Sequence, residues 1–376
     1  MSNAQQNRWP LQRLGDVTDN FDSVRVPVAA RLRKAGPFPY YGATGIVDRI
    51  NDYLFDGEYV LVAEDGENLR SRKEPLVFTA KGKFWVNNHA HVLQGNGRAL
   101  TSYVAYALSC QDVHGFLTGS TFPKLTQDSL GRIMIPVPPP EAQSQITSVL
   151  GALDEKVQAN SRMIATLRQS MQHAFDAVAQ VPAVLGDIAY ESRDKISPAK
   201  TPTAAFYLFS IPAFDDGRGP EDVIGSSVKS DKWLITEPAV LVSKLNPTTP
   251  RTWLANPVPA RPAIASTEFV VLRPAGKVAI GLLYLACCTS AFKRALVERV
   301  TGTTGSHQRV AADDMLRIAI RIPNKESALP VHRLVGSGLE LLNMLARESA
   351  ILAQIRDLLL PRLISGEIHL ADAGRP

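Results

Sequence analysis

Two polar loops in this sequence combine hydroxyl side chains with a terminal cation. Residues 118–124 read Thr-Gly-Ser-Thr-Phe-Pro-Lys, and residues 301–309 read Thr-Gly-Thr-Thr-Gly-Ser-His-Gln-Arg. Hydroxyl and backbone N–H groups donate hydrogen bonds to phosphate oxygens, and an amide or guanidinium such as Gln308 or Arg309 can reach base edges. A structural turn before a strand is the alternative. Because hydroxyls and a cation occur in both loops, we favour contact with DNA.

An aromatic pair beside a glycine turn is a third candidate site. Tyr40 and Tyr41 precede the segment Gly42-Ala43-Thr44-Gly45. Glycine has no side chain, so the backbone at this turn could approach a phosphate closely. An ordinary β-hairpin explains the same residues equally well, and both interpretations stay open.

Motifs for catalysis are missing or incomplete. The sequence contains no Gly-x-x-x-x-Gly-Lys-Ser/Thr phosphate-binding loop and no glycine-rich dinucleotide motif. His89 and His91 stand two residues apart on an expected strand, without a third ligand at a metal-binding spacing, so we interpret them as hydrogen-bonded strand histidines. Asn246-Pro247 resembles the start of an amino-methyltransferase motif, but threonines follow where a proline and an aromatic ring are needed. We therefore assign no catalytic residue, metal or cofactor.

The second half of the chain repeats the first. Leu14-Gly15-Asp16-Val17 returns 171 positions later as Leu185-Gly186-Asp187-Ile188, and the hydroxyl-rich loops are 183 positions apart. The run 132–138 returns 185 positions later as 317–323, and the same offset of 185 continues into the following segment. The offset changes only inside the globular part, which indicates two variable domains held by spacers of constant length. The repeat also predicts that Ile368 lies close to Leu11.

The chain-wide properties permit DNA binding without requiring it. A length of 376 residues is enough for two domains. The formal net charge of +5 is compatible with a nucleic-acid partner. Cys110, Cys287 and Cys288 form neither a disulfide framework nor a zinc motif. The longest apolar run, residues 278–288, is too short for a membrane span. We therefore expect a cytoplasmic protein that does not associate with membranes.

Heptad spacing predicts two long helices. The first helix follows Pro138-Pro139-Pro140-Glu141, and the second covers about residues 330–364, with Pro361 expected to kink its last turns. Each helix could pack on its own domain, but the narrow seams favour an antiparallel coiled coil. The seam residues are Leu153, Val157, Asn160, Ile164, Leu167, Met171 and Ala174 in the first helix, and Leu341, Leu345, Leu352, Ile355 and Leu359 in the second.

The predicted fold class is mixed α/β (α+β) with a pseudo-two-fold internal repeat. We expect a first domain at residues 5–138, a first spacer helix at 139–179, a second domain at 180–323 and a second spacer helix at 330–366.

In this tandem order, several short motifs make the chain resemble the specificity subunit of a type I restriction-modification system. Each motif is weak alone, but their order and the helix after each domain are specific, and the resemblance covers nearly the whole chain. The motifs are Leu14-Gly15-Asp16, Tyr41-Gly42-Ala43-Thr44-Gly45, Asn88-His89-Ala90-His91, the loop 118–124, the join 135–143, Leu153-Asp154-Glu155-Lys156, Ser243-Lys244-Leu245-Asn246-Pro247, Ser306-His307-Gln308-Arg309-Val310 and the segment 358–367.

The resemblance implies two target-recognition domains, each reading one half of a split, asymmetric site in double-stranded DNA. It also implies that the helices dock two modification (methyltransferase) subunits, which carry the S-adenosylmethionine chemistry, and that ATP-driven cleavage resides on a restriction subunit. The second join, 323–330, lacks the Pro-Pro-acid-x-Gln pattern of residues 139–143, which leaves docking on that side less certain. The predicted DNA-binding residues are Tyr40, Tyr41, Thr44, Ser120, Thr121, Lys124, Lys244, Asn246, Thr304, Ser306, His307, Gln308 and Arg309.

Two other functions are compatible with the same residues. The chain could serve a stand-alone DNA methyltransferase that has no restriction partner, or it could be a tandem protein-interaction scaffold that never binds DNA.

Overall fold

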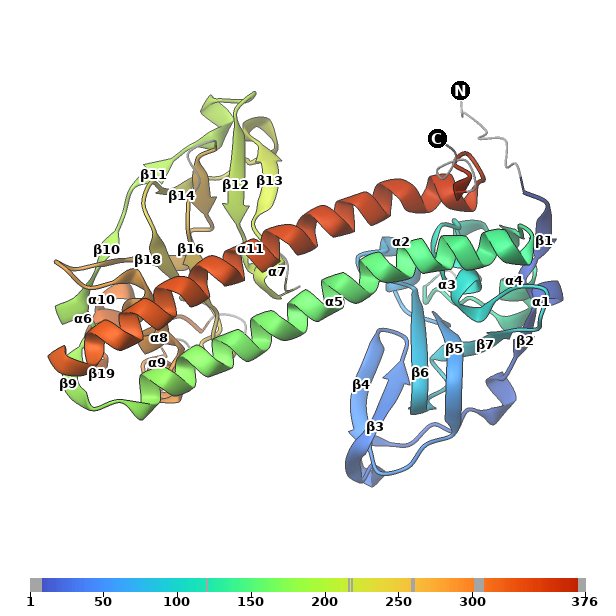
Figure 1. Ribbon diagram of the computed structural model, residues 1–376, viewed down its shortest axis with the longest axis horizontal. Helices are drawn as coiled ribbons and strands as arrows, with labels where there is room; N and C mark the ends of the chain where they lie inside the picture. Colours follow the sequence, from blue (N-terminus) through green and yellow to red (C-terminus); the bar gives the residue numbers. More distant parts are fainter. Residues whose placement is uncertain are drawn as a thin grey trace. The chain divides into compact units, whose positions relative to one another are not determined.

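The computed structural model describes residues 9–119, 121–215, 217, 219–257, 261–300 and 308–370. The chain divides into two compact units, Met1–Lys156 with Leu352–Pro376 and Val157–Ile351. The long helices α5 (Pro140–Ala177) and α11 (Lys325–Ile364) each contribute one part to each unit. Both units combine sheets with helices (Figure 1), which confirms the predicted mixed α/β class.

The first unit is built on a six-stranded sheet of order β2-β7-β5-β6-β3-β4. Successive residues of β5 face opposite sides: Val60 and Val62 pack in one hydrophobic cluster and Leu61 in another. Helix α3 packs on the Val60 side. The elements are β1 (Leu11–Arg13), α1 (Leu14–Val17), β2 (Thr18–Asn20), β3 (Ala35–Gly42), β4 (Gly45–Ile50), β5 (Phe55–Ala63), α2 (Asn68–Ser71), β6 (Val77–Val86), β7 (Ala90–Gly95), α3 (Thr101–Ser109), α4 (Gln127–Gly131) and β8 (Met134–Pro136), with 3-10 turns at Asp22–Val24, Ala30–Leu32 and His114–Phe116.

The second unit divides its strands between a four-stranded sheet, β10-β18-β15-β16, and a five-stranded sheet, β11-β14-β17-β12-β13. Val240 and Val242 of β15 pack in one cluster and Leu241 in another, as in β5. The elements are β9 (Gln180–Val184), α6 (Leu185–Ile188), β10 (Ala189–Ser192), β11 (Lys195–Ile196), β12 (Ala205–Phe209), α7 (Ile211–Asp215), β13 (Glu221–Ile224), β14 (Lys232–Ile235), β15 (Ala239–Ser243), β16 (Thr252–Ala255), β17 (Ala263–Ala265), β18 (Phe269–Pro274), α8 (Ile280–Cys288), α9 (Ser290–Glu298), α10 (Ala312–Leu316) and β19 (Ala319–Pro323), with 3-10 turns at Pro198–Lys200 and Gly225–Ser227.

The internal repeat is visible in the backbone hydrogen bonds. The pair β1–β8 corresponds to β9–β19, and both are antiparallel. The Leu14 N–H donates to the Ile133 carbonyl at 2.8 Å, and the Leu185 N–H donates to the Ile318 carbonyl at 2.9 Å. The sheet order β2-β7-β5 likewise matches β10-β18-β15. The predicted repeat is therefore confirmed. The two units differ in the arrangement of the remaining strands.

Gln143 fixes the start of α5. Its side chain is 1% exposed. The amide nitrogen donates to the carbonyls of Arg98 (3.1 Å) and Pro138 (2.9 Å), while the amide oxygen accepts from the Leu100 N–H (2.8 Å). The glutamine of the proline-rich join thus ties the helix to the loop before α3.

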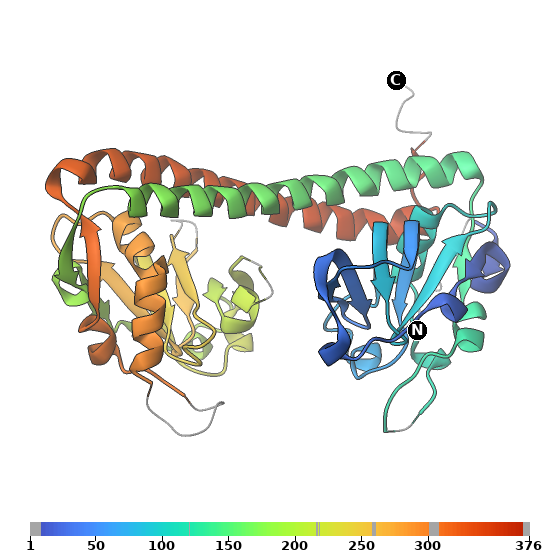
Figure 2. The same ribbon diagram turned by 90° about the horizontal axis from the view of Figure 1, so that it is seen from below.

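The two long helices pack antiparallel, as predicted. In the first unit, Ile146 and Leu150 near the start of α5 share a core with Leu363 near the end of α11 (Figure 2). In the second unit, the later α5 residue Leu167 packs against a core cluster that contains the early α11 residue Val335. All seven predicted seam residues of α5 are buried or half-buried.

The predicted seam of α11 is wrong in part. Leu341 and Ile355 are exposed, whereas Leu342, which the prediction left out, is buried. The other predicted residues, Leu345, Leu352 and Leu359, are buried or half-buried. Two contacts with α5 set this register: Asn160 Nδ2 donates to Glu348 Oε2 (2.7 Å) and to Ser349 Oγ (3.2 Å), and Gly338 lies directly against Met171. The apolar stripe of α11 is wide enough to fit two seams, and only packing selects between them.

Helix α11 begins at Lys325, ahead of the expected start near Pro330. Asn324 precedes the helix, and its side-chain oxygen accepts a hydrogen bond from the Ser327 N–H at 2.9 Å. An asparagine in this position satisfies a free N–H of the first helical turn, so the helix can start there. The helix continues through Pro330 and Pro361 and ends at Ile364.

The two ends of the described chain meet in the first unit. The ring of Trp9 lies 4.6 Å from that of His369, centroid to centroid, and its Nε1 donates to the Leu363 carbonyl at 3.3 Å. Ile368 packs against the same core as Leu14. The ends of the described chain therefore lie together, which is the arrangement that the repeat predicts.

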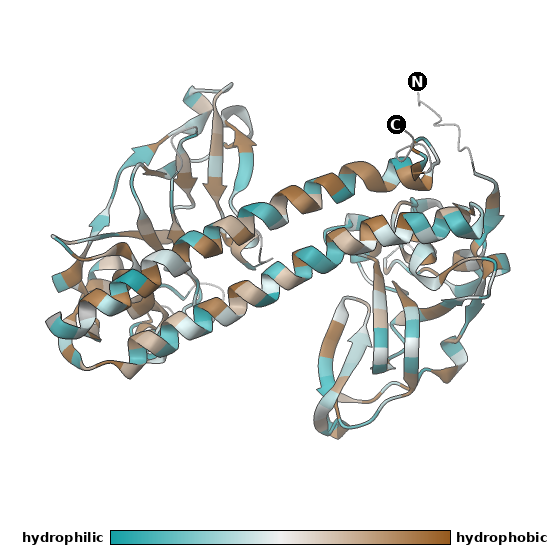
Figure 3. Ribbon diagram, in the orientation of Figure 1, coloured by the Kyte–Doolittle hydropathy of each residue, from teal (hydrophilic) through white to brown (hydrophobic). Residues whose placement is uncertain are grey.

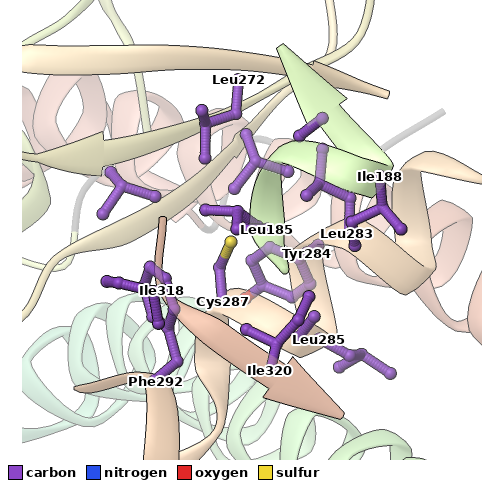
Figure 4. Close-up of a cluster of buried hydrophobic side chains, with 14 of the residues drawn as sticks. Leu185, Ile188, Leu272, Leu283, Tyr284, Leu285, Cys287, Phe292, Ile318 and Ile320 are labelled. Carbon is purple, nitrogen blue, oxygen red and sulfur yellow. The ribbon is translucent and has the colours of Figure 1, made fainter. Parts of the chain in front are cut away.

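The core of the second unit encloses Cys287 (Figure 4), and the adjacent Cys288, which is partly buried, packs against this core. Burial raises the pKa of the Cys288 thiol to about 11, and it raises the pKa of the Cys287 thiol well above its usual value. Among the described residues, no single helix is long and apolar enough to cross a membrane. Helices α8 and α9 meet the length and composition criteria only as a pair bent by 65°.

Candidate nucleic-acid interface

The same backbone junction occurs at the end of β5 and at the end of β15. After β5, the Glu64 N–H donates to the His89 carbonyl at 2.9 Å; after β15, the Lys244 N–H donates to the Glu268 carbonyl at 2.8 Å. Glu64 therefore occupies the position of Lys244, and His89 occupies the position of Glu268. The motif comprising Lys244 and Asn246 is thus the counterpart of residues 64–66.

Each junction receives the end of its hydroxyl-rich loop. The Leu125 N–H donates to the Glu64 carbonyl (2.8 Å), and the Val310 N–H donates to the Lys244 carbonyl (3.1 Å). One residue earlier, Lys124 and Arg309 form equivalent isolated β-bridges with Asp65 and Leu245. The two predicted loop cations therefore emerge from the same place in the two domains.

At each junction, one residue in the left-handed backbone conformation turns the chain. Gly66 has φ +105° and Asn246 has φ +48°. Their N–H groups donate to the carbonyls of Pro123 (3.2 Å) and Gln308 (3.1 Å). Asparagine tolerates this conformation better than most residues, so Asn246 has a backbone role at the site where we predict a DNA contact. Its Oδ1 atom is buried and has no hydrogen-bond partner among the described residues.

The first loop has a fixed neck and an exposed tip. Thr118 and Lys124 exchange two backbone hydrogen bonds of 2.8 Å, and Arg70 Nη2 donates to the Gly119 carbonyl at 2.9 Å. Gly119 has φ +82°, and a Cβ there would lie 2.2 Å from the Phe122 carbonyl oxygen, so only glycine fits. Thr121 is exposed and Phe122 is 61% exposed. Ser120 lies outside the described residues.

Both loop cations are paired with glutamates. Lys124 Nζ lies 3.0 Å from Glu64 Oε1. Arg309 forms two contacts with Glu268, Nε to Oε2 at 3.2 Å and Nη2 to Oε1 at 3.1 Å. Gln308 is half-buried, and Thr304, Ser306 and His307 lie outside the described residues. The described part of each loop thus presents a cation together with its own counter-ion.

Glu64 belongs to a larger buried ion network. Arg25 Nη1 donates to Glu64 Oε2 at 2.6 Å, and Arg25 Nη2 lies 3.4 Å from Asp22 Oδ2. Burial acts to raise the pKa of the Glu64 carboxyl, but hydrogen bonds from Arg25 and Lys124 and the nearby positive charges outweigh it, so the pKa is lowered. The carboxylate at this junction is therefore ionised near neutral pH.

His91 joins the network to the loop. Its Nδ1 lies 2.5 Å from Asp22 Oδ2, and its Nε2 lies 2.7 Å from the Leu125 carbonyl. For Asp22, burial again acts to raise the pKa, and the hydrogen bond and charge of His91 outweigh it, giving a lowered pKa. Asp22, Glu64 and His91 lie within 4.8 Å of one another, as metal ligands do. The Arg25 guanidinium contacts both carboxylates, so a cationic side chain already pairs with each of them.

Strands β3 and β4 form a β-hairpin, and the aromatic pair lies on β3. Tyr40 is buried, its hydroxyl accepts from the Val28 N–H at 2.9 Å, and the Arg33 guanidinium lies 4.4 Å from its ring centroid. Tyr41 is half-buried against Phe84, and burial raises the pKa of its hydroxyl. Thr44 alone of the three predicted residues is exposed at the turn. Tyr40 therefore has a packing role in this structure.

Sequence reasoning missed the carboxylates and one arginine of these junctions. Glu64 directly follows an apolar strand, which is a visible signal, but its partners Arg25 and Lys124 are far away in sequence. Arg251 is similar: it is buried beneath the 245–250 loop and makes two contacts with Asp215, at 2.6 and 2.8 Å. No spacing rule predicts such pairs.

Comparison with known proteins places the first junction in a family context. Residues 7–169 match the family model described as a type I restriction modification DNA specificity domain. A putative type I restriction enzyme specificity subunit of Haemophilus influenzae is 38% identical over 144 residues, which is 38% of this chain and 36% of that protein. The specificity subunit of the type I restriction enzyme MpnII of Mycoplasma pneumoniae is 29% identical over 125 residues, 32% of this chain and 36% of that protein. These matches span only about a third of each relative's length.

A solved structure described as the S subunit of a type I restriction-modification system from M. genitalium aligns with 97% of this chain and 98% of its own, with a TM-score of 0.62 and 15% identity. This level of similarity shows a shared fold. The resemblance to type I restriction-modification specificity subunits is confirmed.

Proposed function

We propose that this chain is a non-catalytic, DNA-binding specificity subunit that recognises a split, asymmetric site, with each unit reading one half. The equivalent junctions after β5 and β15, each carrying a loop that ends in a cation, are the observation that carries the proposal. Of the predicted residues within the described chain, Thr44, Thr121, Lys124 and Arg309 are exposed. Hydroxyls and cations of this kind position a protein on the phosphate backbone.

We further propose that α11 docks a modification subunit. Apolar residues Leu334, Leu341, Met344 and Ile351 are exposed on this helix, and Met344 is 67% exposed. Their spacings of seven, three and seven residues place them on one face, as in a coiled-coil seam. Figure 3 shows how frequently apolar residues occur along α11. Two copies of the modification subunit, and a restriction subunit where one exists, follow from the family resemblance.

The docking proposal has a direct test. Met344→Glu should abolish or strongly weaken co-purification with the modification subunit, because it places a charge in an apolar interface. Ala346→Glu is the matched control: it adds the same charge to the same helix two residues away, on the opposite side. Equal retention of the partner by both variants would contradict docking at this face.

The recognition proposal is tested by a methylation map. Cells carrying the gene with its modification subunit should methylate adenines in one split sequence, and deletion of the gene should remove that methylation. Exchange of residues 9–138 for the domain of a relative should change one half of the site only. Changes in both halves would contradict the assignment of one half to each unit.

Two other outcomes would identify the alternative functions. Methylation without any restriction gene nearby would indicate a stand-alone methyltransferase subunit. Absence of both methylation and duplex binding, with partner subunits present, would indicate an interaction scaffold.

A further inference from the structure

The loop cations of the two units are equivalent, but the glutamates that bind them are not. Lys124 and Arg309 occupy matching β-bridges. Lys124 pairs with Glu64, the residue after β5, whereas Arg309 pairs with Glu268, the residue before β18. In the second unit Lys244 stands at the position of Glu64; in the first unit His89 stands at the position of Glu268. The two halves thus form the same ion pair from different strands.

We propose that Glu64 and Glu268 are internal counter-ions that compete with DNA phosphate for the loop cations and thereby limit affinity for DNA of any sequence. The inference rests on the proposed function, because it requires that these loops meet DNA. The proposed function names residues that promote DNA binding. The inference extends this set by two carboxylates that oppose it. Such competing elements are a common means of raising specificity, since they penalise contacts that carry no sequence information.

The geometry of Arg309 makes the competition direct. Both of its contacts with Glu268 use the guanidinium N–H groups that would contact a phosphate in the same two-pronged manner. The Arg309 side chain is 47% exposed and that of Glu268 is 33% exposed, so the pair lies at the surface that a duplex would approach. When phosphate replaces the carboxylate, Glu268 loses its partner and faces the negative backbone. DNA binding therefore includes the cost of opening the pair.

The two units differ in how tightly the cation is held. Glu64 is 10% exposed and also contacts Arg25 at 2.6 Å, so it keeps a cationic partner when Lys124 leaves. Among the described residues, only Arg309 forms an ion pair with Glu268. Release of Arg309 should therefore cost more than release of Lys124. The effect of the counter-ion on DNA affinity should therefore be larger in the second unit.

The experiment uses the full chain and a duplex that lacks the methylated sequence, with the dissociation constant measured over a range of salt concentrations. Glu268→Gln keeps the size of the side chain and removes its charge. We expect about 2- to 5-fold tighter binding, the range for loss of one exposed ion pair. The slope of log affinity against log salt should stay unchanged, because the same phosphate contacts form before and after the substitution.

Two controls separate the pair from general charge effects. Asp357→Asn removes the same single charge from α11, where Arg356 keeps its contact with Asp154 at 2.8 Å, and it should bind DNA as the parent does. Arg309→Gln should lower the salt slope by about 0.9, and in that background Glu268→Gln should give no gain. Glu268→Asp, which shortens the reach of the carboxylate, should give a smaller gain than Glu268→Gln and serves if the glutamine variant unfolds.

Weaker or equal binding by a folded Glu268→Gln or Glu268→Asp variant would overturn the inference, because it would mean that Glu268 orients Arg309 for DNA instead of withholding it. A gain that persists in the Arg309→Gln background would overturn it as well. A parent chain that binds no duplex, alone or with its partner subunits, would instead refute the proposed function.

Discussion

The contact between Gly338 and Met171 gives the sharpest test of the helix pairing. In the second unit, a Cβ on Gly338 would lie 2.4 Å from Met171 Sδ and 3.2 Å from Met171 Cγ, and Met171 is fully buried. Gly336 lies two residues earlier on the same helix, and a Cβ there would meet nothing within 4 Å. Replacing each glycine with alanine therefore makes a matched pair of variants.

The two substitutions should change stability in different ways. Alanine favours a helix interior over glycine by about 1 kcal/mol, so Gly336→Ala should stabilise the protein by roughly that amount. Gly338→Ala gains the same term but forces Met171 out of place, and overpacking of a core costs about 1–3 kcal/mol. The net change at Gly338 is therefore about 0 to 2 kcal/mol of destabilisation. For a unit of this size, each 1 kcal/mol shifts the Tm by roughly 2–4 °C.

Thermal unfolding of the two variants measures the difference. The parent should have a lower Tm than Gly336→Ala. The Tm of Gly338→Ala should lie about 2–12 °C below that of Gly336→Ala, because overpacking costs about 1–3 kcal/mol and each 1 kcal/mol shifts the Tm by about 2–4 °C. Met171→Ala should cost less in the Gly338→Ala background than in the parent, since the new methyl group fills part of the space. Equal stabilisation by both alanines would refute close packing of α11 against α5 at this point.

Three further predictions concern the loops, the ion network and the chain ends. Lys124→Gln and Arg309→Gln should each weaken binding to every duplex and lower the salt slope by about 0.9; unchanged affinity of the double variant would remove these loops from the interface. Because the pKa values of Asp22 and Glu64 are lowered in the folded state, their stabilisation is present above their ordinary values of 3.8 and 4.5 and is lost as the pH falls from there through the lower folded-state pKa values; acid titration of unfolding should show a smaller loss of stability for Asp22→Asn than for the parent. A circular permutant that joins the chain ends and opens after Ala177 should fold and direct methylation to the same site, and a soluble, partner-bound permutant without methylation would contradict the repeat. The opening avoids Gln180, because β9 pairs with β19 from that residue onward.

Patterns with a strong local cause were readable from the sequence. The α5 seam follows from heptad spacing, because each seam residue returns to one helix face every seven positions. The repeat of Leu14-Gly15-Asp16 as Leu185-Gly186-Asp187 identified the frame in which the sheets β2-β7-β5 and β10-β18-β15 correspond. The loops that end in Lys124 and Arg309 were recognisable in that frame because both combine hydroxyl side chains with a terminal cation.

Features that depend on distant partners were decided only by tertiary structure. The stripe on α11 fits two seams, and the contacts of Asn160 and Met171 select the one that contains Leu342 instead of Leu341. Tyr40 resembles a surface aromatic in sequence, but the hydroxyl contact with Val28 and the stacked Arg33 place it inside the domain.

The sequence by itself determined that the chain is a tandem repeat with two spacer helices and a loop cation in each half. These properties are periodic or local, and a periodic signal survives without knowledge of the fold. The tertiary structure decided that each cation is bound by a glutamate, and that the two glutamates come from different strands. An ion pair needs only that two side chains meet in space, and residues 60 or 41 positions apart meet only after the sheet has formed.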